Sequence, residues 1–315
     1  MSSAGSLPQP LRGIVPPLVT PLKGRDELDV AGLERLVERV LAGGVSGLFI
    51  LGTTGEAPSL SHRLRAELVQ RVCRQVAGRA PVLVGVTDTS FIESVNLARL
   101  AAEAGAAAVV TATPYYFPSG QEELREYLGH LLEALPLPLL LYNMPSLTKV
   151  RFERETLRWA VDQPGILGIK DSSGDMLYFH DVVELGRARP DWSVMMGPEQ
   201  LLAEAVLLGA HGGICGGANF HPRLYVELYR AAAERDWERM LELNRRVHEI
   251  ARAIYEVGRH ASAVIKGIKC VLSLQGVCDD YMAEPFHRFR EAERRVVAER
   301  AAALGLLEEP PRVTG

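Results

Sequence analysis

Lys170 is the residue of this chain best suited to covalent chemistry. It ends the apolar run Ile166-Leu167-Gly168-Ile169, so its side chain is expected to reach out of a dry interior. Burial disfavours the charged form of an amine, and a neutral amine can attack a ketone to form a Schiff base. The alternative is an ion pair with Asp171 or Asp175, which by itself is the commoner state of a lysine at the end of a strand.

Other polar side chains also follow apolar runs and could assist such a lysine. Tyr142 ends a second run, and its phenol could carry protons to and from a substrate oxygen. The segment Gly52-Thr53-Thr54-Gly55 offers two hydroxyls and free backbone N–H groups, which suit a carboxylate. Each of these features also has a purely structural alternative. Tyr142 could be a core tyrosine with its hydroxyl in water, and the threonine segment could be a tight turn. Tyr115-Tyr116, which follow another apolar run, could be core aromatics.

Competing chemistries have weaker support in the sequence. The eight histidines are dispersed without an HxxxH pair, whereas a catalytic zinc site needs several ligands close together. There is no GxSxG segment, and the threonine loop lacks the Gly-Lys-Ser/Thr ending of a phosphate-binding loop. The sequence therefore predicts no metal and no organic cofactor.

The elements that must position these residues repeat along the chain. Eight short, nearly continuous apolar runs alternate with helical patterns, as in parallel strands covered on both faces. The runs cover residues 13–19, 45–51, 81–86, 107–112, 137–142, 166–170, 192–196 and 212–215. This count predicts an α/β fold, a (β/α)₈ TIM barrel, with the active site at the carboxyl ends of its strands.

The helical patterns extend beyond the last strand. Between strands they cover residues 30–41, 60–76 (with Ser61 as N-cap), 94–104, 121–135, 154–161, 178–189 and 200–208. After the eighth strand they cover 223–234, 237–256, 262–274 and 284–303. We therefore predict a barrel over 11–221, a C-terminal helical region over 222–305 packed on it, and frayed tails at 1–10 and 306–315.

Composition narrows the class of protein. The 315 residues are 47% hydrophobic and 23% charged with a net charge of −4, which argues against whole-chain disorder and against nucleic-acid binding. No apolar run reaches the roughly 20 residues of a membrane span, and the N-terminus does not resemble a signal peptide. Four separated cysteines favour a reduced, cytoplasmic enzyme.

Lysine is scarce in this chain. Only five of its 35 basic residues are lysines: Lys23, Lys149, Lys170, Lys266 and Lys269. Lys170 alone has a proposed role that arginine cannot take, since a guanidinium stays protonated. At Lys266 and Lys269, on a late helix, we expect that arginine could serve.

Four motifs in order resemble the dihydrodipicolinate synthase / N-acetylneuraminate lyase family over roughly residues 11–305. They are Gly52-Thr53-Thr54-Gly55-Glu56, Thr113-Pro114-Tyr115-Tyr116, Tyr142-Asn143-Met144-Pro145 and Gly168-Ile169-Lys170-Asp171. The resemblance implies a class I aldolase barrel that uses pyruvate or another 2-oxo acid, usually as a homotetramer built from two tight dimers.

The resemblance also implies roles for individual residues. Lys170 matches the Schiff-base lysine and Tyr142 the catalytic tyrosine. Thr53 matches the hydroxyl that links two tyrosines in a proton relay, and Tyr116 the second tyrosine, which reaches into the neighbouring subunit's site. The residues implied in substrate binding are Gly52, Thr54, which matches a pyruvate-carboxylate ligand, and Ile214, whose backbone carbonyl faces the site.

One position departs from the family pattern. Dihydrodipicolinate synthases typically continue the tyrosine motif as YNxPxRT, in which the arginine binds the carboxylate of aspartate semialdehyde. Leu147 stands there and offers no donor, with Lys149 or Arg151 as candidate substitutes. An apolar residue at this position is similar to the pattern of sialic acid lyases and 2-keto-3-deoxy sugar acid aldolases. Sialic acid lyases also place acidic residues that bind substrate hydroxyls after the seventh strand, where this chain has Glu199. Glu199 could do the same, or it could be a solvated residue at the start of a helix.

These observations favour a Schiff-base aldolase or lyase acting on pyruvate or a 2-oxo acid, of the 2-keto-3-deoxy sugar acid or 4-hydroxy-2-oxoglutarate type. Three alternatives stay open: condensation of pyruvate with aspartate semialdehyde, dehydration of a 2-keto-3-deoxy acid, and a non-catalytic barrel that binds a 2-oxo acid. The expected partners are a small-molecule substrate and further copies of the chain, not nucleic acid or membrane. The aldehyde partner, the direction and the stereochemistry are left undetermined.

Overall fold

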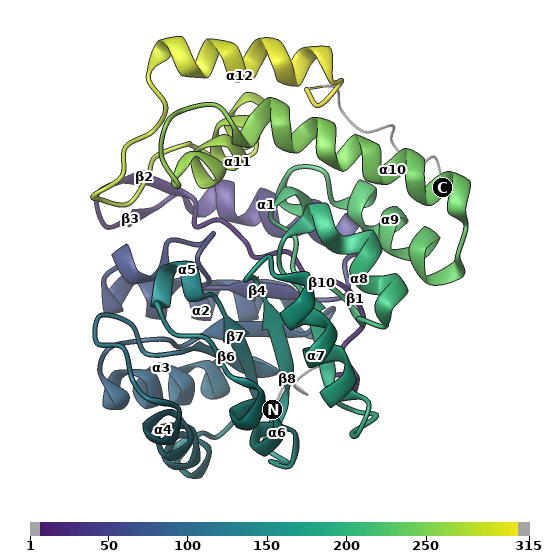
Figure 1. The fold of residues 1–315 in the computed structure, drawn as a ribbon. Helices are drawn as coiled ribbons and strands as arrows, with labels where there is room; N and C mark the ends of the chain where they lie inside the picture. The colour runs from purple at the N-terminus through teal and green to yellow at the C-terminus, as the bar shows by residue number, and fades with distance from the viewer. Residues whose placement is uncertain (1–6, 308–315) are drawn as a thin grey trace.

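The strands form one parallel sheet that closes on itself. A computed structural model describes residues 7–307 (Figure 1). In sheet order the strands are β1 (Gly13–Ile14), β10 (Gly212–Gly213), β9 (Ser193–Met196), β8 (Ile166–Asp171), β7 (Leu139–Asn143), β6 (Ala108–Ala112), β5 (Val82–Gly85) and β4 (Leu48–Ile50). A parallel bridge between Pro17 and Phe49 joins the two edges. The fold is the predicted (β/α)₈ barrel, and each of the eight apolar runs supplies one strand.

Helices surround the barrel in chain order. They are α1 (Val30–Ala42), α2 (His62–Val76), α3 (Phe91–Ala104), α4 (Gln121–Ala134), α6 (Arg154–Val161), α7 (Met176–Gly186) and α8 (Leu202–Leu208). Ser61 caps α2 as predicted, because its hydroxyl accepts a hydrogen bond from the Leu64 N–H. The sequence did not predict the hairpin β2 (Leu22–Gly24)/β3 (Glu27–Leu28) or the short helix α5 (Pro145–Thr148).

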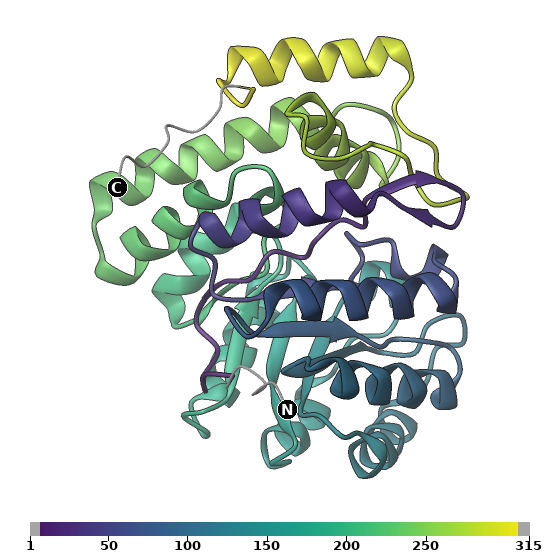
Figure 2. The same cartoon turned by 180° about the vertical axis from the view of Figure 1, so that it is seen from behind.

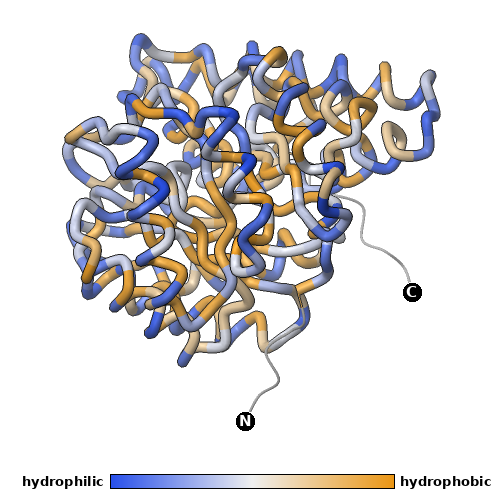
Figure 3. The backbone as a smooth tube through the Cα atoms, turned by 60° about the horizontal axis from the view of Figure 1, so that its bottom comes forward, coloured by the Kyte–Doolittle hydropathy of each residue, from blue (hydrophilic) through white to orange (hydrophobic). Residues whose placement is uncertain are grey.

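Two apolar clusters hold these layers together. One lies between strands and helices; the other fills the barrel and includes Val15, Phe49, Leu140 and Met195. Figure 3 shows the hydrophobic segments gathered in the interior. Leu11 belongs to the inner cluster and donates its N–H to Ser193 Oγ at the start of β9. The amino end of the barrel is therefore plugged, which leaves the carboxyl ends of the strands for a site.

The C-terminal region is helical, as predicted. It contains α9 (Pro222–Glu234), α10 (Trp237–Ile250), a π-helical turn η4 (Ala251–Tyr255), α11 (Ala263–Leu274) and α12 (Glu291–Ala303). Figures 1 and 2 show α10, α11 and α12 layered on one side of the barrel next to α1. The last helix begins at residue 291 rather than 284, since Pro285 follows Glu284 and disfavours a helical conformation there.

The predicted tails lie mostly outside the described residues, at 1–6 and 308–315. Inside them, Leu7 packs against the inner cluster and Leu306 is buried. Within residues 7–307 no helix is both long and apolar enough to cross a membrane.

Candidate active site

An extra residue in β8 sets the direction of Lys170. Leu139 pairs with Ile166, but the next residue, Leu140, pairs with Gly168, so the strand carries one additional residue between them. Such a bulge shifts the alternation of side chains by one position. Without it, Lys170 would share the outward face of Ile166; with it, Lys170 turns inward beside Tyr142, its partner on β7.

Gly168 makes this bulge possible. Its φ is +150°, and a Cβ there would lie 2.0 Å from the Ser193 carbonyl oxygen on β9. The close approach of the two strands therefore requires glycine. The glycine that precedes Lys170 by two positions is part of the device that points the lysine into the barrel.

Lys170 lies in an aromatic, nearly dry environment. The residue is 4% exposed, and its Nζ lies 3.9 Å from the centre of the Tyr142 ring and 5.3 Å from that of Phe49. Among the described residues it has no ion-pair partner, so the alternative of a pair with Asp171 or Asp175 is wrong. The amine is left facing the interior of the barrel.

The two aspartates are engaged elsewhere. Asp171 accepts hydrogen bonds from Asn143 Nδ2 (2.7 Å) and from the backbone N–H and hydroxyl of Ser173. Burial raises the pKa of the Asp171 carboxyl, and these hydrogen bonds oppose that shift. Asp175 caps α7 through the Leu177 and Tyr178 N–H groups.

The tyrosine and threonine predicted to assist Lys170 do meet. Tyr142 Oη and Thr53 Oγ1 share a hydrogen bond of 3.1 Å, although the two residues come from β7 and from the loop after β4. Tyr142 is buried, and its ring contacts Lys170. Lys170, Tyr142 and Thr53 therefore form one cluster at the carboxyl ends of three strands.

The loop that carries Thr53 is anchored to the C-terminal helices. The Thr20 hydroxyl donates to the Gly55 carbonyl at 2.7 Å. Glu56 Oε1 lies 2.5 Å from Lys269 Nζ with both side chains fully buried, and Glu56 Oε2 accepts the Ala283 N–H. Lys269 therefore has a buried partner that the sequence analysis did not foresee, and the expectation that arginine could serve there stays untested. The sequence offered one indication of this contact, because Glu56 is an acidic residue in a motif that otherwise contains only glycine and threonine.

The other predicted substrate-binding residues occupy different settings. Gly52 packs against Phe49, whose ring would lie 2.6 Å from an added Cβ, and Thr54 is half-buried beside Thr53. Ile214 belongs to the inner cluster, with its N–H bonded to the Met196 carbonyl. These placements put Gly52 and Thr54 next to the Lys170 cluster and Ile214 inside the barrel.

Tyr116 is not part of the cluster in the single chain. It is 74% exposed, has a φ of +81°, and stacks edge-on against the exposed Phe117 with ring centres 5.0 Å apart. The hydrogen bond to Thr53 that a relay would need is absent from the described residues. The structure therefore brings together three of the four predicted catalytic residues.

Glu199 is neither solvated nor free to bind a substrate hydroxyl. It is buried, and its Oε2 accepts the Gly217 N–H at 2.7 Å while its Oε1 accepts the hydroxyls of Tyr225 and Tyr255 at 2.6 Å each. Burial raises the pKa of this carboxyl despite these donors. Tyr255 comes from the π-helical turn, a feature found often at functional sites. Glu199 thus fixes the loop that follows β10.

Leu147 lies on α5, the short helix that follows β7, and is 52% exposed. Lys149, just after α5, is exposed, and Arg151 lies 3.8 Å from Asp175 and over the Tyr178 ring. Arg151 is therefore engaged by its own neighbours, and a role of either residue in place of an arginine at 147 stays a prediction. The position keeps its apolar character in the folded chain.

Fold and site together define a barrel enzyme of the lyase class, with a buried lysine at the carboxyl end of β8. The chain belongs to the dihydrodipicolinate synthetase family, whose model matches residues 10–304. A solved dihydrodipicolinate synthase from Bacteroides thetaiotaomicron is 53% identical with a TM-score of 0.92, covering 94% of this chain and 99% of that one.

Two further relatives show the range of the family. The 4-hydroxy-tetrahydrodipicolinate synthase of Methanopyrus kandleri is 32% identical over 306 residues, which cover 95% of this chain and 98% of the relative. YagE, a prophage protein of this family from E. coli K12 solved in complex with pyruvate, is 27% identical with a TM-score of 0.88. It covers 94% of this chain and 99% of its own.

Proposed function

We propose that Lys170 forms a Schiff base with pyruvate or another 2-oxo acid and that the enzyme makes or breaks the bond at pyruvate C3. The observation that carries the proposal is the Lys170 Nζ over the Tyr142 ring, with Tyr142 hydrogen-bonded to Thr53. An amine in this position can attack a ketone carbon, and a phenol beside it can move the protons that dehydration of the carbinolamine requires.

In the cleavage direction the steps balance without a cofactor. The lysine nitrogen adds to the substrate C2 carbonyl and water leaves, which gives a protonated imine. Loss of the proton from the C4 hydroxyl breaks the C3–C4 bond, and its electron pair moves into the imine as an enamine while the aldehyde departs. Protonation at C3 and hydrolysis then release pyruvate and free Lys170. Condensation is the reverse sequence.

For the second substrate we propose an aldehyde that needs no carboxylate ligand at position 147, as in 2-keto-3-deoxy sugar acid cleavage. In the 4-hydroxy-2-oxoglutarate type the aldehyde is glyoxylate, whose carboxylate a group other than Leu147 would hold. Arginine holds a carboxylate in a bidentate manner, and Leu147 has no donor. The second candidate is 4-hydroxy-tetrahydrodipicolinate synthesis from pyruvate and aspartate semialdehyde. It is supported by the Methanopyrus kandleri relative, which carries that name, and by the 53% identical solved structure, which is named dihydrodipicolinate synthase.

We also propose that the working enzyme is a homo-oligomer, a tetramer built from dimers. The exposed pair Tyr116 and Phe117 presents two large aromatic side chains to solvent, and contiguous exposed apolar surface marks contact sites. Tyr116 would then complete the relay of a neighbouring subunit.

Borohydride trapping tests the proposed chemistry. The enzyme is incubated with pyruvate and reduced, and the modified peptide is mapped by mass spectrometry. We expect an adduct on Lys170 that is absent in Lys170→Arg and retained in the control Lys149→Arg, at an exposed lysine. Failure to trap any adduct would refute the Schiff base. A panel of aldehydes then separates the candidates: efficient turnover of aspartate semialdehyde favours the synthase.

A further inference from the structure

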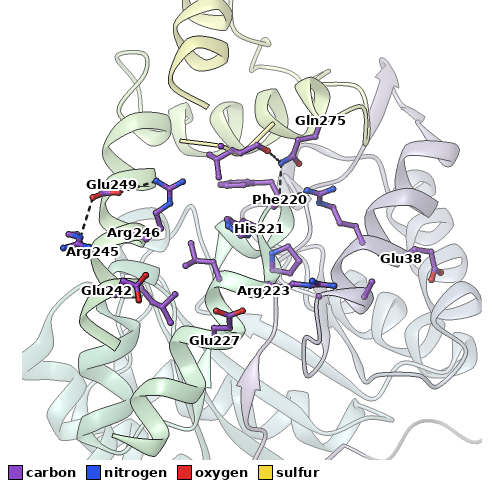
Figure 4. Close-up of a pocket in the computed structure, with 18 of the residues that line it drawn as sticks. Glu38, Phe220, His221, Arg223, Glu227, Glu242, Arg245, Arg246, Glu249 and Gln275 are labelled. Carbon is purple, nitrogen blue, oxygen red and sulfur yellow. Dashed lines mark hydrogen bonds and ion pairs between the residues drawn. The ribbon is translucent and has the colours of Figure 1, made fainter. Parts of the chain in front are cut away.

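A large cavity outside the barrel is not used by the proposed reaction. It has a volume of about 1110 Å³ and opens between α1, the start of α9 and α10, with Gln275 at one side (Figure 4). Neither Lys170, Tyr142 nor Thr53 lines it. Pockets for small ligands typically measure about 300–1,000 Å³, so this cavity is slightly larger than that range and has room for a metabolite.

The lining of this cavity is rich in arginine. Six arginines contribute to it: Arg35, Arg39, Arg223, Arg239, Arg245 and Arg246. Three are neutralised by carboxylates: Arg239 pairs with Glu227 and Glu242, and Arg245 and Arg246 share Glu249. Within residues 7–307, Arg35, Arg39 and Arg223 have no carboxylate within 4.0 Å. Two more glutamates reach the lining, the exposed Glu34 and Glu38, which pairs with Arg79. Positive charge is therefore in excess.

Arg39 is the arginine whose setting calls most clearly for an anion. One of its terminal nitrogens donates to the Phe220 carbonyl at 2.9 Å, whereas its Nε is buried without a hydrogen-bond partner among the described residues. Burial lowers the pKa of this guanidinium. Taking a charged group out of water without a counter-charge is costly, and an anion would offset that cost.

His221 lies among the charged side chains of the cavity. Figure 4 shows its ring in the middle of the cavity, with Arg246 and Arg223 on opposite sides in this view. Burial lowers the pKa of His221, Arg246 and Arg39 lower it further, and Glu227 opposes them. Pro222 and Leu243 add apolar surface to the same walls. The cavity thus combines uncompensated guanidinium groups with contacts for a carbon skeleton.

We propose that this cavity binds a small organic anion with at least two negative charges, held by Arg39 and Arg223, with its apolar part against Pro222 and Leu243. Guanidinium forks fit carboxylate and phosphate oxygens equally well in geometry. The shared chemistry is therefore that of a polycarboxylate or a phosphate-bearing metabolite. This inference does not depend on the chemistry at Lys170.

Two probes distinguish the two classes of ligand: citrate represents polycarboxylates and pyrophosphate represents phosphate-bearing metabolites. Each is titrated into the full-length protein in a calorimeter at about 0.15 M ionic strength. We expect saturable binding of at least one probe. Arg39→Gln and Arg223→Gln should each weaken it about tenfold or more, and Arg71→Gln, at an exposed arginine paired with Glu67, should not. Arg223→Gln keeps the test valid if Arg39→Gln disturbs the fold.

The location is tested by the rate at which diethyl pyrocarbonate modifies each histidine, mapped by mass spectrometry. A bound anion shields His221 and raises its pKa, and both effects slow its modification, so we expect a several-fold decrease there and none at the exposed His62. Binding of citrate alone identifies a carboxylate site, and of pyrophosphate alone a phosphate site. Absence of binding, equal loss in Arg71→Gln, or an unchanged rate at His221 would each overturn the proposal.

Discussion

Replacement of Lys269 by methionine should destabilise the protein severely although Lys269 does not belong to the cluster of Lys170, Tyr142 and Thr53. The Lys269 ammonium lies 2.5 Å from Glu56 Oε1 and donates to the Tyr281 carbonyl at 2.7 Å, and both charged side chains are fully buried. Lys269→Met fills a similar volume but leaves the Glu56 carboxylate buried with one remaining donor, the Ala283 N–H. Removing one partner of a buried pair costs about 3–5 kcal/mol.

A double-mutant cycle measures this coupling by urea unfolding at pH 7. Lys269→Met and Glu56→Gln should each be strongly destabilising, and the double variant should lose less than the sum of the two, since no charge is then left unpaired. Lys23→Met is the matched control, because its pair with Glu27 is exposed and worth roughly 0.2–1 kcal/mol. If Lys269→Met costs no more than Lys23→Met, or if the cycle is additive, the buried pair does not anchor the Thr53 loop.

Three further changes test the site and the surface. Gly168→Ala places a Cβ 2.0 Å from a carbonyl oxygen of β9. We expect the free energy of unfolding to fall by about 1–3 kcal/mol and kcat to fall by about 10²-fold, because the Lys170 side chain is displaced. A near-normal kcat would contradict the role assigned to the bulge. Thr53→Val removes the hydrogen bond to Tyr142 while keeping a side chain of similar shape. We expect kcat to fall about 10²-fold while borohydride still traps a pyruvate adduct on Lys170. An unchanged kcat would show that Thr53 is not part of the proton relay. The hydrogen bonds from Arg79 hold the pKa of Glu38 at about 2, below its ordinary value of 4.5. The ionised Glu38 therefore stabilises the fold fully above pH 4.5, and this stabilisation is lost as the pH falls toward 2. The melting temperature of Glu38→Gln should be lower than that of the unchanged protein at pH 7 and equal to it at low pH, and a difference that persists at pH 2 would refute the assignment.

The fold and the cluster of Lys170, Tyr142 and Thr53 were predictable because their signals are local. Each strand is a short apolar run, and the residues that end the runs must meet at one rim when the strands are parallel and the barrel closes. Lys170 and Tyr142 end such runs, and Thr53 follows closely after another. The inward direction of Lys170 was not predictable in this way, since simple alternation from Ile166 places it outward until the bulge at Gly168 is included.

The state of buried charges could not be predicted from local pattern. Glu199 looks like a helix-start residue in the sequence, and only the packing of α9 and the π-helical turn brings Tyr225 and Tyr255 to its carboxylate. Lys269 lies on an amphipathic helix where either face was possible, and its partner Glu56 comes from the opposite end of the chain. A polar residue is buried by contacts that its own segment does not encode.

The scarcity of lysine gains its meaning from these contacts. Lys23 and Lys149 are exposed, whereas Lys170, Lys266 and Lys269 are buried, and the contacts of Lys170 and Lys269 give each a reason to be lysine. The proposed reaction requires Lys170 to lose its proton, which a guanidinium cannot do. Lys269 is fully buried and places a compact ammonium between two acceptors, a setting in which a larger, planar guanidinium is not an equivalent replacement. Replacement by arginine should therefore fail in two different ways: at Lys170 the fold survives and imine trapping is lost, while at Lys269 stability falls first and trapping persists in the molecules that remain folded.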